Sequence, residues 1–414
     1  MTTRPLILKH LSQPRPWTAA AVMLAAALAC AALTVADGRF GERSWALVAG
    51  VVFGIALQRG ELSLVRAWRD LMMLGDGRQL TGFLAALAVA ATLTLGGFAT
   101  FGLSPPANAR IGPVDWLLPV AAFVFGVGSV VARGGVMVHL RRLSEGSLVA
   151  APALAATFLG FVLGLMSWPW SWDVAIGHAP RPWLPGELGI GLWTTLALEL
   201  AVVALCIGLL WRYRPDIGPD RRSLAVRILV EPWPAVWAGA LLGALVAASY
   251  AAAEPLGLIA ECATVARALA TLLGLTPVHL PGLDAGVGGL VIPLIQRIEA
   301  SEHVVIIFGF LFGAFACAVA SGRFSLTGFS GREAVEMVVG GVMLGWGAMT
   351  ALGAVTGEAI AGVAVGALSG WVFLAFASLG VVAALKLDPR QAVTAPPPVP
   401  SDELPEDRKD PLGG

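Results

Sequence analysis

Ten apolar segments recur along this 414-residue chain and decide what it can fold into. They cover residues 17–36, 44–57, 80–101, 116–131, 147–166, 188–210, 235–253, 304–320, 334–349 and 366–385. Backbone polar groups find no water in hydrocarbon, so a segment of about 17 to 25 apolar residues crosses a bilayer as a helix. Only 13% of the residues are charged, against about 25% in an ordinary soluble domain. The sequence therefore predicts an all-α, polytopic membrane protein with about ten transmembrane segments.

The rest of the composition excludes other classes of protein. A net charge of zero offers no electrostatic footprint for nucleic acid. The four cysteines show no CxxC pattern and no Cys/His ligand spacing, so they predict neither a disulfide framework nor a metal site. Paired catalytic carboxylates, a nucleophile–base spacing and an ATP-binding motif are also missing from the sequence. We therefore expect no enzymatic activity, no cofactor and no metal ion.

The arginines and lysines predict how the segments are oriented. If all ten cross, most basic residues collect on one side, namely Arg4, Lys9, Arg15, Arg141, Arg142, Arg212, Arg214, Arg221, Arg222, Arg227, Arg323, Arg332, Lys386 and Arg390. By the positive-inside rule this side is cytoplasmic. The opposite connections, 103–114, the Trp-rich loop 168–172 and the Pro-rich loop 274–302, are poor in Lys and Arg. The sequence thus predicts a multi-pass protein of the bacterial inner membrane with both termini in the cytoplasm.

Three of the segments run into glycine-rich breaks. Segments 44–57, 116–131 and 334–349 are short for a crossing. The first is followed by Gln58-Arg59-Gly60, which places an amide and a guanidinium at the break. Irregular backbone and a charged side chain are costly in hydrocarbon and persist mainly where they line a cavity or a substrate path. The pattern is typical of a transport protein.

The chain also contains an internal repeat. The glycines at 126, 128, 134 and 146 recur in register at 345, 347, 353 and, after one extra residue, 366. Because one copy starts outside and the other inside, the two copies have inverted topology, as in many transporters. The expected organisation is an N-terminal tail with an extra transmembrane helix (1–43), a first repeat (44–166), a linker with one transmembrane helix and a basic cytoplasmic loop (167–234), a second repeat (235–387) and a disordered Pro-rich tail (388–414).

Several of these stretches resemble the YeeE/YedE sulfur-transport family, to which the thiosulfate permeases belong. Leu57-Gln58-Arg59-Gly60, followed by Ala67-Trp68-Arg69-Asp70, is similar to its first signature. The second and third signatures resemble Gly134-Gly135-Val136 leading to Glu145-Gly146-Ser147, and the stretch 345–357 leading to Gly366, Gly370 and Trp371. Pro255-Leu256-Gly257-Leu258 resembles the pore turn of the second half. The resemblance extends from about residue 44 to residue 385.

The chain departs from this family at three positions. The thiosulfate permeases place one cysteine in each signature, and the resemblance implies that these thiols pass the sulfur anion along the pore. Here the three positions are Ser63, Gly135 and Ala354, so a relay of thiols through them is impossible. Cys262, close to the second-half turn, either substitutes in part or serves only in packing.

The remaining candidate residues each have two interpretations. Arg59 either binds an anion through its guanidinium or caps the carbonyl end of segment 44–57. The glycine breaks either expose the N–H groups of following short helices, which attract anions, or serve helix packing. Glu261 and Glu358 each follow a pore turn, so one of them either carries a coupling proton or pairs with Arg59 or Arg133; the alternative is a carboxylate that faces the lumen or the interface.

The resulting prediction is a transporter of a small inorganic anion, such as thiosulfate, through a central pore between the repeats. The alternative is a non-transporting membrane partner that docks a small cytoplasmic sulfur-carrier protein through the basic loop 212–227. The predicted substrate-binding residues are Gln58, Arg59, Gly60, Ser63, Gly134, Gly135, Gly257, Glu261, Cys262, Gly353, Ala354 and Thr356.

Overall fold

A computed structural model describes residues 15–187, 189–213, 231–252, 257–276, 279–283 and 302–387. Most of the basic loop, the residues Pro255 and Leu256, most of the Pro-rich loop 274–302 and the C-terminal tail lie outside these residues, and so do the predictions made for them. The described part is helical and contains no strand beyond two isolated bridges, Ser147–Thr327 and Trp183–Ala367. The predicted all-α membrane architecture is thereby confirmed.

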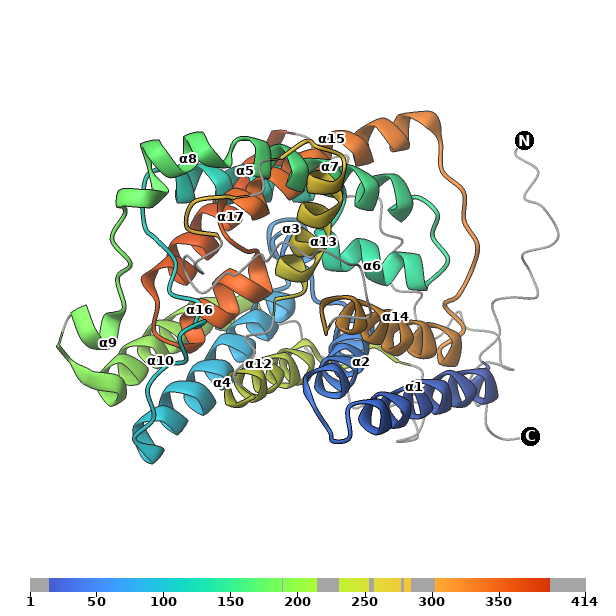
Figure 1. Cartoon of the computed structure of the whole chain (residues 1–414), viewed down its shortest axis with the longest axis horizontal. Helices are drawn as coiled ribbons and strands as arrows, with labels where there is room; N and C mark the ends of the chain where they lie inside the picture. The colour runs from blue at the N-terminus through green and yellow to red at the C-terminus, as the bar shows by residue number, and fades with distance from the viewer. Residues whose placement is uncertain are drawn as a thin grey trace.

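Each of the ten predicted apolar segments coincides with a helix (Figure 1). They are α1 (Pro16–Ala36), α2 (Glu42–Gly60), α4 (Arg78–Phe101), α5 (Leu117–Val131), α7 (Ala150–Met166), α10 (Gly191–Leu210), α12 (Ala235–Ala251), α14 (Glu302–Ala320), α15 (Gly331–Thr350) and α17 (Leu368–Leu387). By length and hydropathy, the described residues give seven spans, or eight if the bent pair α7 and α8 is one span. Shorter apolar helices, α12 among them, accompany these spans.

Short helices follow the breaks, but two of the preceding helices are longer than predicted. Helix α2 has 19 residues and α15 has 20, so the prediction that segments 44–57 and 334–349 are short is wrong. Gln58 and Arg59 are buried within α2 and do not end it. A capping box between Ser330 and Glu333 starts α15 earlier than the apolar run does. Helix α5, with 15 residues, is short as expected.

The elements after the breaks begin where the glycine patterns predict. They are α3 (Leu64–Leu74), α6 (Val136–Ser144), α13 (Leu258–Leu272) and the π-helix η5 (Val355–Ile360), which continues into α16 (Ala361–Ala364). A π-helix is rare and occurs frequently at functional sites.

The Trp-rich stretch 168–172, predicted as a loop, is helical. It forms α8 (Trp168–Val174), which bends by 50° from α7. Trp168 is fully buried, and its indole N–H donates to the carbonyl of Pro281 at 2.8 Å. Burying this side chain offsets the cost of ordering the turn, which the sequence pattern did not reveal. Three further short elements are η2 (Ile176–His178), α9 (Leu184–Glu187) and η3 (Trp211–Tyr213).

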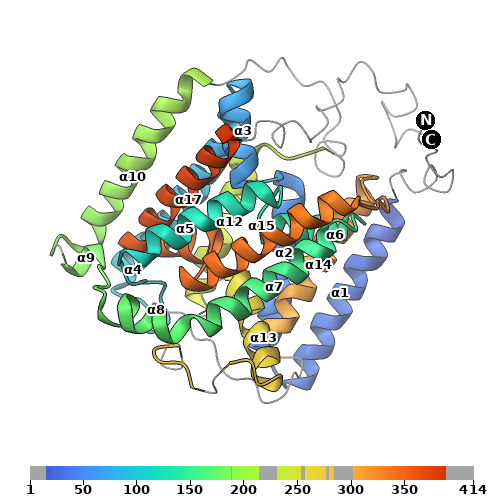
Figure 2. The same cartoon turned by 90° about the horizontal axis from the view of Figure 1, so that it is seen from above.

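Helices from the two halves of the chain pack in matched pairs (Figure 2). Helix α2 contacts α14, and α12 contacts α4. Helix α5 contacts α17, and α7 contacts α15. Glycines allow these close approaches, since a Cβ at Gly54 would lie 2.2 Å from the carbonyl oxygen of Phe310. Much of the core therefore lies between the halves rather than within either one.

The arginine-bearing connections lie at one edge of this bundle. Backbone hydrogen bonds join Arg15 to Val319 (3.0 Å) and Gly77 to Tyr213 (2.8 Å), so α1 starts beside the end of α14 and α4 starts beside the end of α10. Ser325, in the connection after α14, donates its N–H to the carbonyl of Glu145 at 2.9 Å. Arg78 and Arg212 thus lie next to the Gly77–Tyr213 contact, and Arg141, Arg142 and Arg323 lie near the Ser325–Glu145 contact.

Candidate functional site

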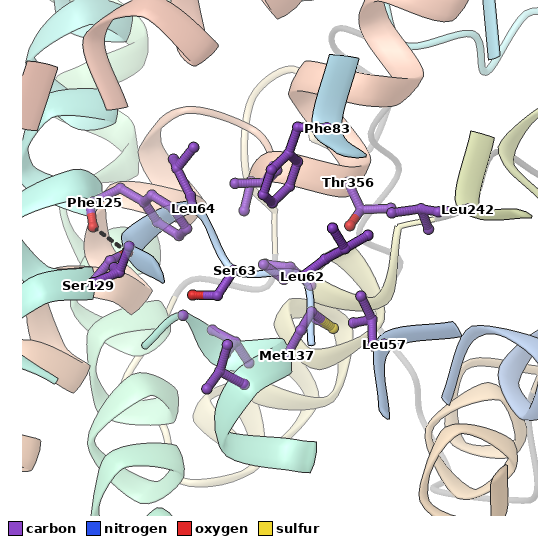
Figure 3. A pocket seen from close by; sticks show the side chains of 17 residues that line it. Leu57, Leu62, Ser63, Leu64, Phe83, Phe125, Ser129, Met137, Leu242 and Thr356 are labelled. Carbon is purple, nitrogen blue, oxygen red and sulfur yellow. Dashed lines mark hydrogen bonds between the residues drawn. The ribbon is translucent and has the colours of Figure 1, made fainter. Parts of the chain in front are cut away.

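A cavity of about 60 Å³ lies where the elements after the breaks begin (Figure 3). Its walls come from both halves of the chain and are mostly apolar. The lining residues are Leu57, Leu62, Ser63, Leu64, Val65, Phe83, Phe125, Ser129, Gly135, Val136, Met137, Val138, Leu242, Ile259, Ala354, Val355 and Thr356. Of the predicted site residues, Ser63, Gly135, Ala354 and Thr356 therefore meet at one place.

Ser63 caps the start of α3 at the cavity wall. Its hydroxyl oxygen accepts from the N–H of Arg66 at 3.5 Å, as an N-cap serine does. A hydroxyl that accepts in this way still has its own hydrogen to donate. In Figure 3 the Ser63 hydroxyl stands among Leu64, Ser129 and Met137. Ser63 can thus offer one donor to a molecule inside the cavity.

Three further elements start toward the cavity without a side-chain cap in the described residues. Gly135 precedes α6, Gly257 precedes α13 and Ala354 precedes η5, and none of them donates or accepts a side-chain capping bond. The first N–H groups of a helix lack partners within the helix. Their partial positive charge favours an anion at the helix start.

Gly135 faces the open part of the cavity. A Cβ built at this position would meet no described atom within 4 Å. The preceding residues form the break itself, because Arg133 has a φ of 56° and Gly134 a φ of 155°. A Cβ at Gly134 would lie 2.6 Å from Val138. Gly134 therefore shapes the wall from behind, whereas Gly135 lies at its surface.

The matching break in the second half is built in the same way. Leu352 has a φ of 60° and is followed by Gly353, whose Cβ would lie 2.9 Å from the Cβ of Glu358. Ala354 then lines the cavity and is 1% exposed. Gly353, like Gly134, lies behind the cavity wall.

Arg59 does not line the cavity. It is buried in the last turn of α2, where its guanidinium interacts with the thiol of Cys317 on α14. Its carbonyl oxygen accepts from the N–H of Trp233 at 2.8 Å. Leu57, two residues earlier, does reach the cavity. The charge of Arg59 thus lies behind the wall at the end of α2.

The neighbours of Arg59 have structural partners of their own. The Gln58 amide donates to Glu145 at 2.7 Å. Gly60 packs against α12, since a Cβ there would lie 2.2 Å from the Cβ of Ala238. Both residues join α2 to other elements and lie outside the cavity wall.

The second-half turn contributes to the cavity through Ile259. Gly257 sets the start of α13 but is not among the lining residues. Cys262 is 3% exposed and also lies outside the wall. The side chain of Glu261 lies outside the described residues.

Sequence reasoning missed Ser129 and the aromatic side chains of the wall. Ser129, on α5, donates its hydroxyl to the carbonyl of Phe125 at 2.8 Å (Figure 3). Phe83 from α4 and Phe125 from α5 close two sides of the cavity. Ser129 lies just over one turn before the Gly134 break, and that spacing is the signal that would have found it. The two phenylalanines look like any other membrane residues in the sequence.

Ion pairs gather at the arginine-bearing edge, close to the end of α2. Glu61, which has a left-handed φ of 48°, pairs with Arg66 of α3 and with Arg323 from the connection after α14. Glu145 pairs with Arg141 at 2.6 Å. Glu61 thus fastens the start of α3 to the connection between α14 and α15, whereas the Arg141–Glu145 pair lies within the end of α6.

The arrangement suits a small anion that has lost its water. Apolar walls exclude water and so strengthen any electrostatic contact inside. The hydroxyl of Ser63 and the backbone N–H groups at the element starts supply donors, and Thr356 supplies another hydroxyl. No thiol is among the lining residues.

Comparison with known proteins agrees with this architecture. A family model described as sulphur transport matches residues 59–383. A thiosulfate transporter, TsuA, of Spirochaeta thermophila is 27% identical over 349 residues, covering 81% of this chain and 95% of that protein. The TsuA thiosulfate transporter of Escherichia coli is 23% identical over 347 residues, covering 81% of this chain and 91% of that protein. The family match covers every residue that lines the cavity except Leu57, and this membrane protein therefore belongs to the sulphur transport family.

Proposed function

We propose that this chain carries thiosulfate, or a closely similar sulfur-containing anion, across the bacterial inner membrane through the cavity. One observation carries the proposal: elements from both halves start at the same small cavity, with Ser63, Gly135 and Ala354 side by side in its wall. Two relatives named as thiosulfate transporters cover most of the chain and point to the same solute.

The proposed site binds the anion without sulfur chemistry. Hydrogen bonds come from the Ser63 and Thr356 hydroxyls and from the N–H groups at the starts of α3, α6 and α13. Arg59 adds positive charge from behind the wall. Donors of this kind release an anion more readily than a covalent bond would, which conduction requires.

The two halves are proposed to form an inverted repeat around this site. The matched contacts of α2 with α14 and of α12 with α4 support it, as do those of α5 with α17 and of α15 with α7. The matched glycines support it too, because Gly146 and Gly366 both adopt a positive φ, 83° and 80°. We place the arginine-bearing edge in the cytoplasm by the positive-inside rule.

The test is thiosulfate exchange by the purified chain in liposomes. We expect labelled thiosulfate to exchange in the wild type. Gly135→Leu should block it, because the added side chain fills the cavity. Gly97→Leu is the control, since a Cβ at Gly97 on α4 meets no described atom within 4 Å and the residue is not part of the cavity wall.

Two results would contradict the proposal. If liposomes that contain the wild-type protein exchange no thiosulfate, thiosulfate is not its substrate. Normal exchange by a folded Gly135→Leu variant would show that the anion does not pass through the cavity. A parallel series with sulfite, sulfate and selenium analogues tells whether another anion is preferred.

A further inference from the structure

Glu358 is a buried carboxylate close to the cavity that anion binding does not use. It lies in η5, two residues after Thr356, which lines the cavity. Its side chain is 1% exposed. Among the described residues, no hydrogen bond of ordinary geometry reaches either carboxylate oxygen. An ionised carboxylate in such surroundings is very costly, whereas a protonated one costs far less.

Two glycines let neighbouring segments pack closely around Glu358. A Cβ at Gly112, in the connection between α4 and α5, would lie 2.8 Å from Oε1 of Glu358. A Cβ at Gly370 of α17 would lie 2.9 Å from the backbone carbonyl oxygen of Glu358. The Ser369 hydroxyl oxygen accepts from the N–H of Gly112 at 3.1 Å and lies beside the carboxylate, toward which its own hydrogen can turn.

One positive charge acts on Glu358. Arg110, buried in the same connection as Gly112, exerts its field on the carboxylate. Its backbone N–H donates to the Tyr250 hydroxyl at 3.3 Å, and that hydroxyl donates to the carbonyl of Ala361 at 2.8 Å. The connection is thus fastened to the same broken element that carries Glu358.

Other ionisable groups on the elements around η5 are few. Helix α16 carries none, and α4 and α17 carry one charged residue each at their ends. Among the described side chains the set consists of Arg110, Tyr250, Cys262 and Arg267 of α13, Arg78 of α4 and Lys386 of α17; α13 also carries Glu261, whose side chain lies outside the described residues. Of the described side chains in this set, only Arg110 is among the groups whose field reaches the carboxylate.

The matching position in the first half is occupied differently. The register that aligns Gly134 with Gly353 aligns His139 with Glu358. His139 is also fully buried, but its Nε2 lies 3.0 Å from the carbonyl oxygen of Gly134, within hydrogen-bond distance of the break that precedes α6. Glu358 has no such bond in the described part of the chain.

We propose that Glu358 binds the proton that accompanies each anion, so that the protein is an anion–proton symporter; this rests on the proposed transport function. An anion in the cavity repels a carboxylate about one turn away and so favours its protonated form. By reciprocity, a proton on Glu358 favours anion binding to the same extent. The carboxylate gains one proton from water on the entry side and returns it on the exit side. A dianion such as thiosulfate would then move with one net negative charge instead of two.

The experiment uses the full chain in liposomes that contain a pH-sensitive dye, with thiosulfate as the probe. In the wild type, thiosulfate uptake should acidify the lumen. A lumen more alkaline by about one pH unit should raise thiosulfate accumulation by up to about tenfold. Glu358→Gln, which is fixed in the neutral form, should still exchange thiosulfate while moving no protons and ignoring the pH gradient.

Glu199→Gln is the matched control. Glu199 is a buried carboxylate on α10, away from the cavity wall, and accepts from the Trp371 indole at 3.4 Å. This variant should keep the wild-type proton coupling.

Each outcome decides the matter. Absence of exchange in the wild type overturns the proposed transport function and the symport with it. Wild-type exchange without proton movement overturns only the symport. Proton movement by the Glu358→Gln variant shows that Glu358 is not the proton-binding site. If Glu358→Gln does not exchange, Glu358→Asp should exchange with a shifted pH dependence, and an unshifted profile overturns the proposal.

Discussion

Gly135 and Gly134 are neighbours in the chain but differ in what a side chain would meet. At Gly135 a Cβ finds open space, whereas at Gly134 it would press on Val138 and the φ of 155° would be strained. We therefore expect Gly135→Cys to fold and transport like the wild type, and Gly134→Cys to lose thermal stability. The cysteine at 135 should also react with a small thiol reagent, and thiosulfate should slow that reaction.

The measurement is labelling of each variant with and without thiosulfate, beside a melting curve in detergent. Equal stability of the two variants would mean that the break is not as rigid as the structure shows. Labelling of Gly135→Cys that thiosulfate leaves unchanged would place the bound anion elsewhere.

Arg59 allows a second test at the residue scale. Arg59→Ala should lower thiosulfate uptake by about tenfold, since a charge that acts on the anion through its field without touching it is worth on the order of 1 kcal/mol. Arg59→Lys, which keeps the charge, should lose less. Arg332→Ala is the control, since that side chain is 90% exposed. Wild-type uptake rates in a folded Arg59→Ala protein would show that its charge does not act on the anion.

The sequence predicted some of these positions and missed the roles of others. The resemblance to the sulfur-transport family located Ser63, Gly135 and Ala354, because they stand where that family has its signature cysteines, and all three line the cavity. The pattern did not tell that Arg59 interacts with Cys317, since the direction of a side chain depends on packing between helices far apart in the chain. Phe83 and Phe125 were missed because phenylalanine faces lipid and cavity alike.

At the scale of helices, glycines at matching positions of the two halves allow the same kind of close helix contact. A Cβ at Gly126 of α5 would lie 2.2 Å from the carbonyl oxygen of Ala377 on α17. A Cβ at Gly345 of α15 would lie 2.1 Å from the carbonyl oxygen of Thr157 on α7. Glycines within helices thus serve packing, and so does Gly60 at the first break, whose Cβ would lie 2.2 Å from that of Ala238.

Replacing these helix glycines should separate the helices. We expect Gly126→Ala and Gly345→Ala each to destabilise the protein by about 1–3 kcal/mol, as overpacking does. Gly97→Ala should be neutral or slightly stabilising, because alanine favours a helix and nothing described lies within 4 Å. Melting temperatures in detergent provide the comparison, and equal values for all three would contradict this account of the contacts.

Helix positions followed from hydropathy because hydrocarbon forces apolar backbone into helices. Helix ends did not, since α15 starts at a polar capping box and α2 continues through Gln58 and Arg59. The helix at 168–174 was not predicted because the stretch reads as a loop in the sequence, which does not show that Trp168 is buried.

For the molecule as a whole, the cysteines lie away from the cavity. Cys30, Cys206, Cys262 and Cys317 are on α1, α10, α13 and α14, and none lines the wall. N-ethylmaleimide should therefore leave wild-type thiosulfate uptake intact, within about twofold of the untreated protein, because the cavity wall contains no thiol. Inactivation that disappears in Cys262→Ser would contradict this and assign that thiol a part in transport.

The contact of α2 with α14 also bears on how the protein is made. The glycine face of α2, at Gly50 and Gly54, fits only the backbone of α14, which the ribosome supplies after more than half of the chain has followed. At about 5–20 residues per second this interval is on the order of tens of seconds. Until then the glycine face of α2 lacks its partner, and we expect a chain truncated before α14 to leave that face without it.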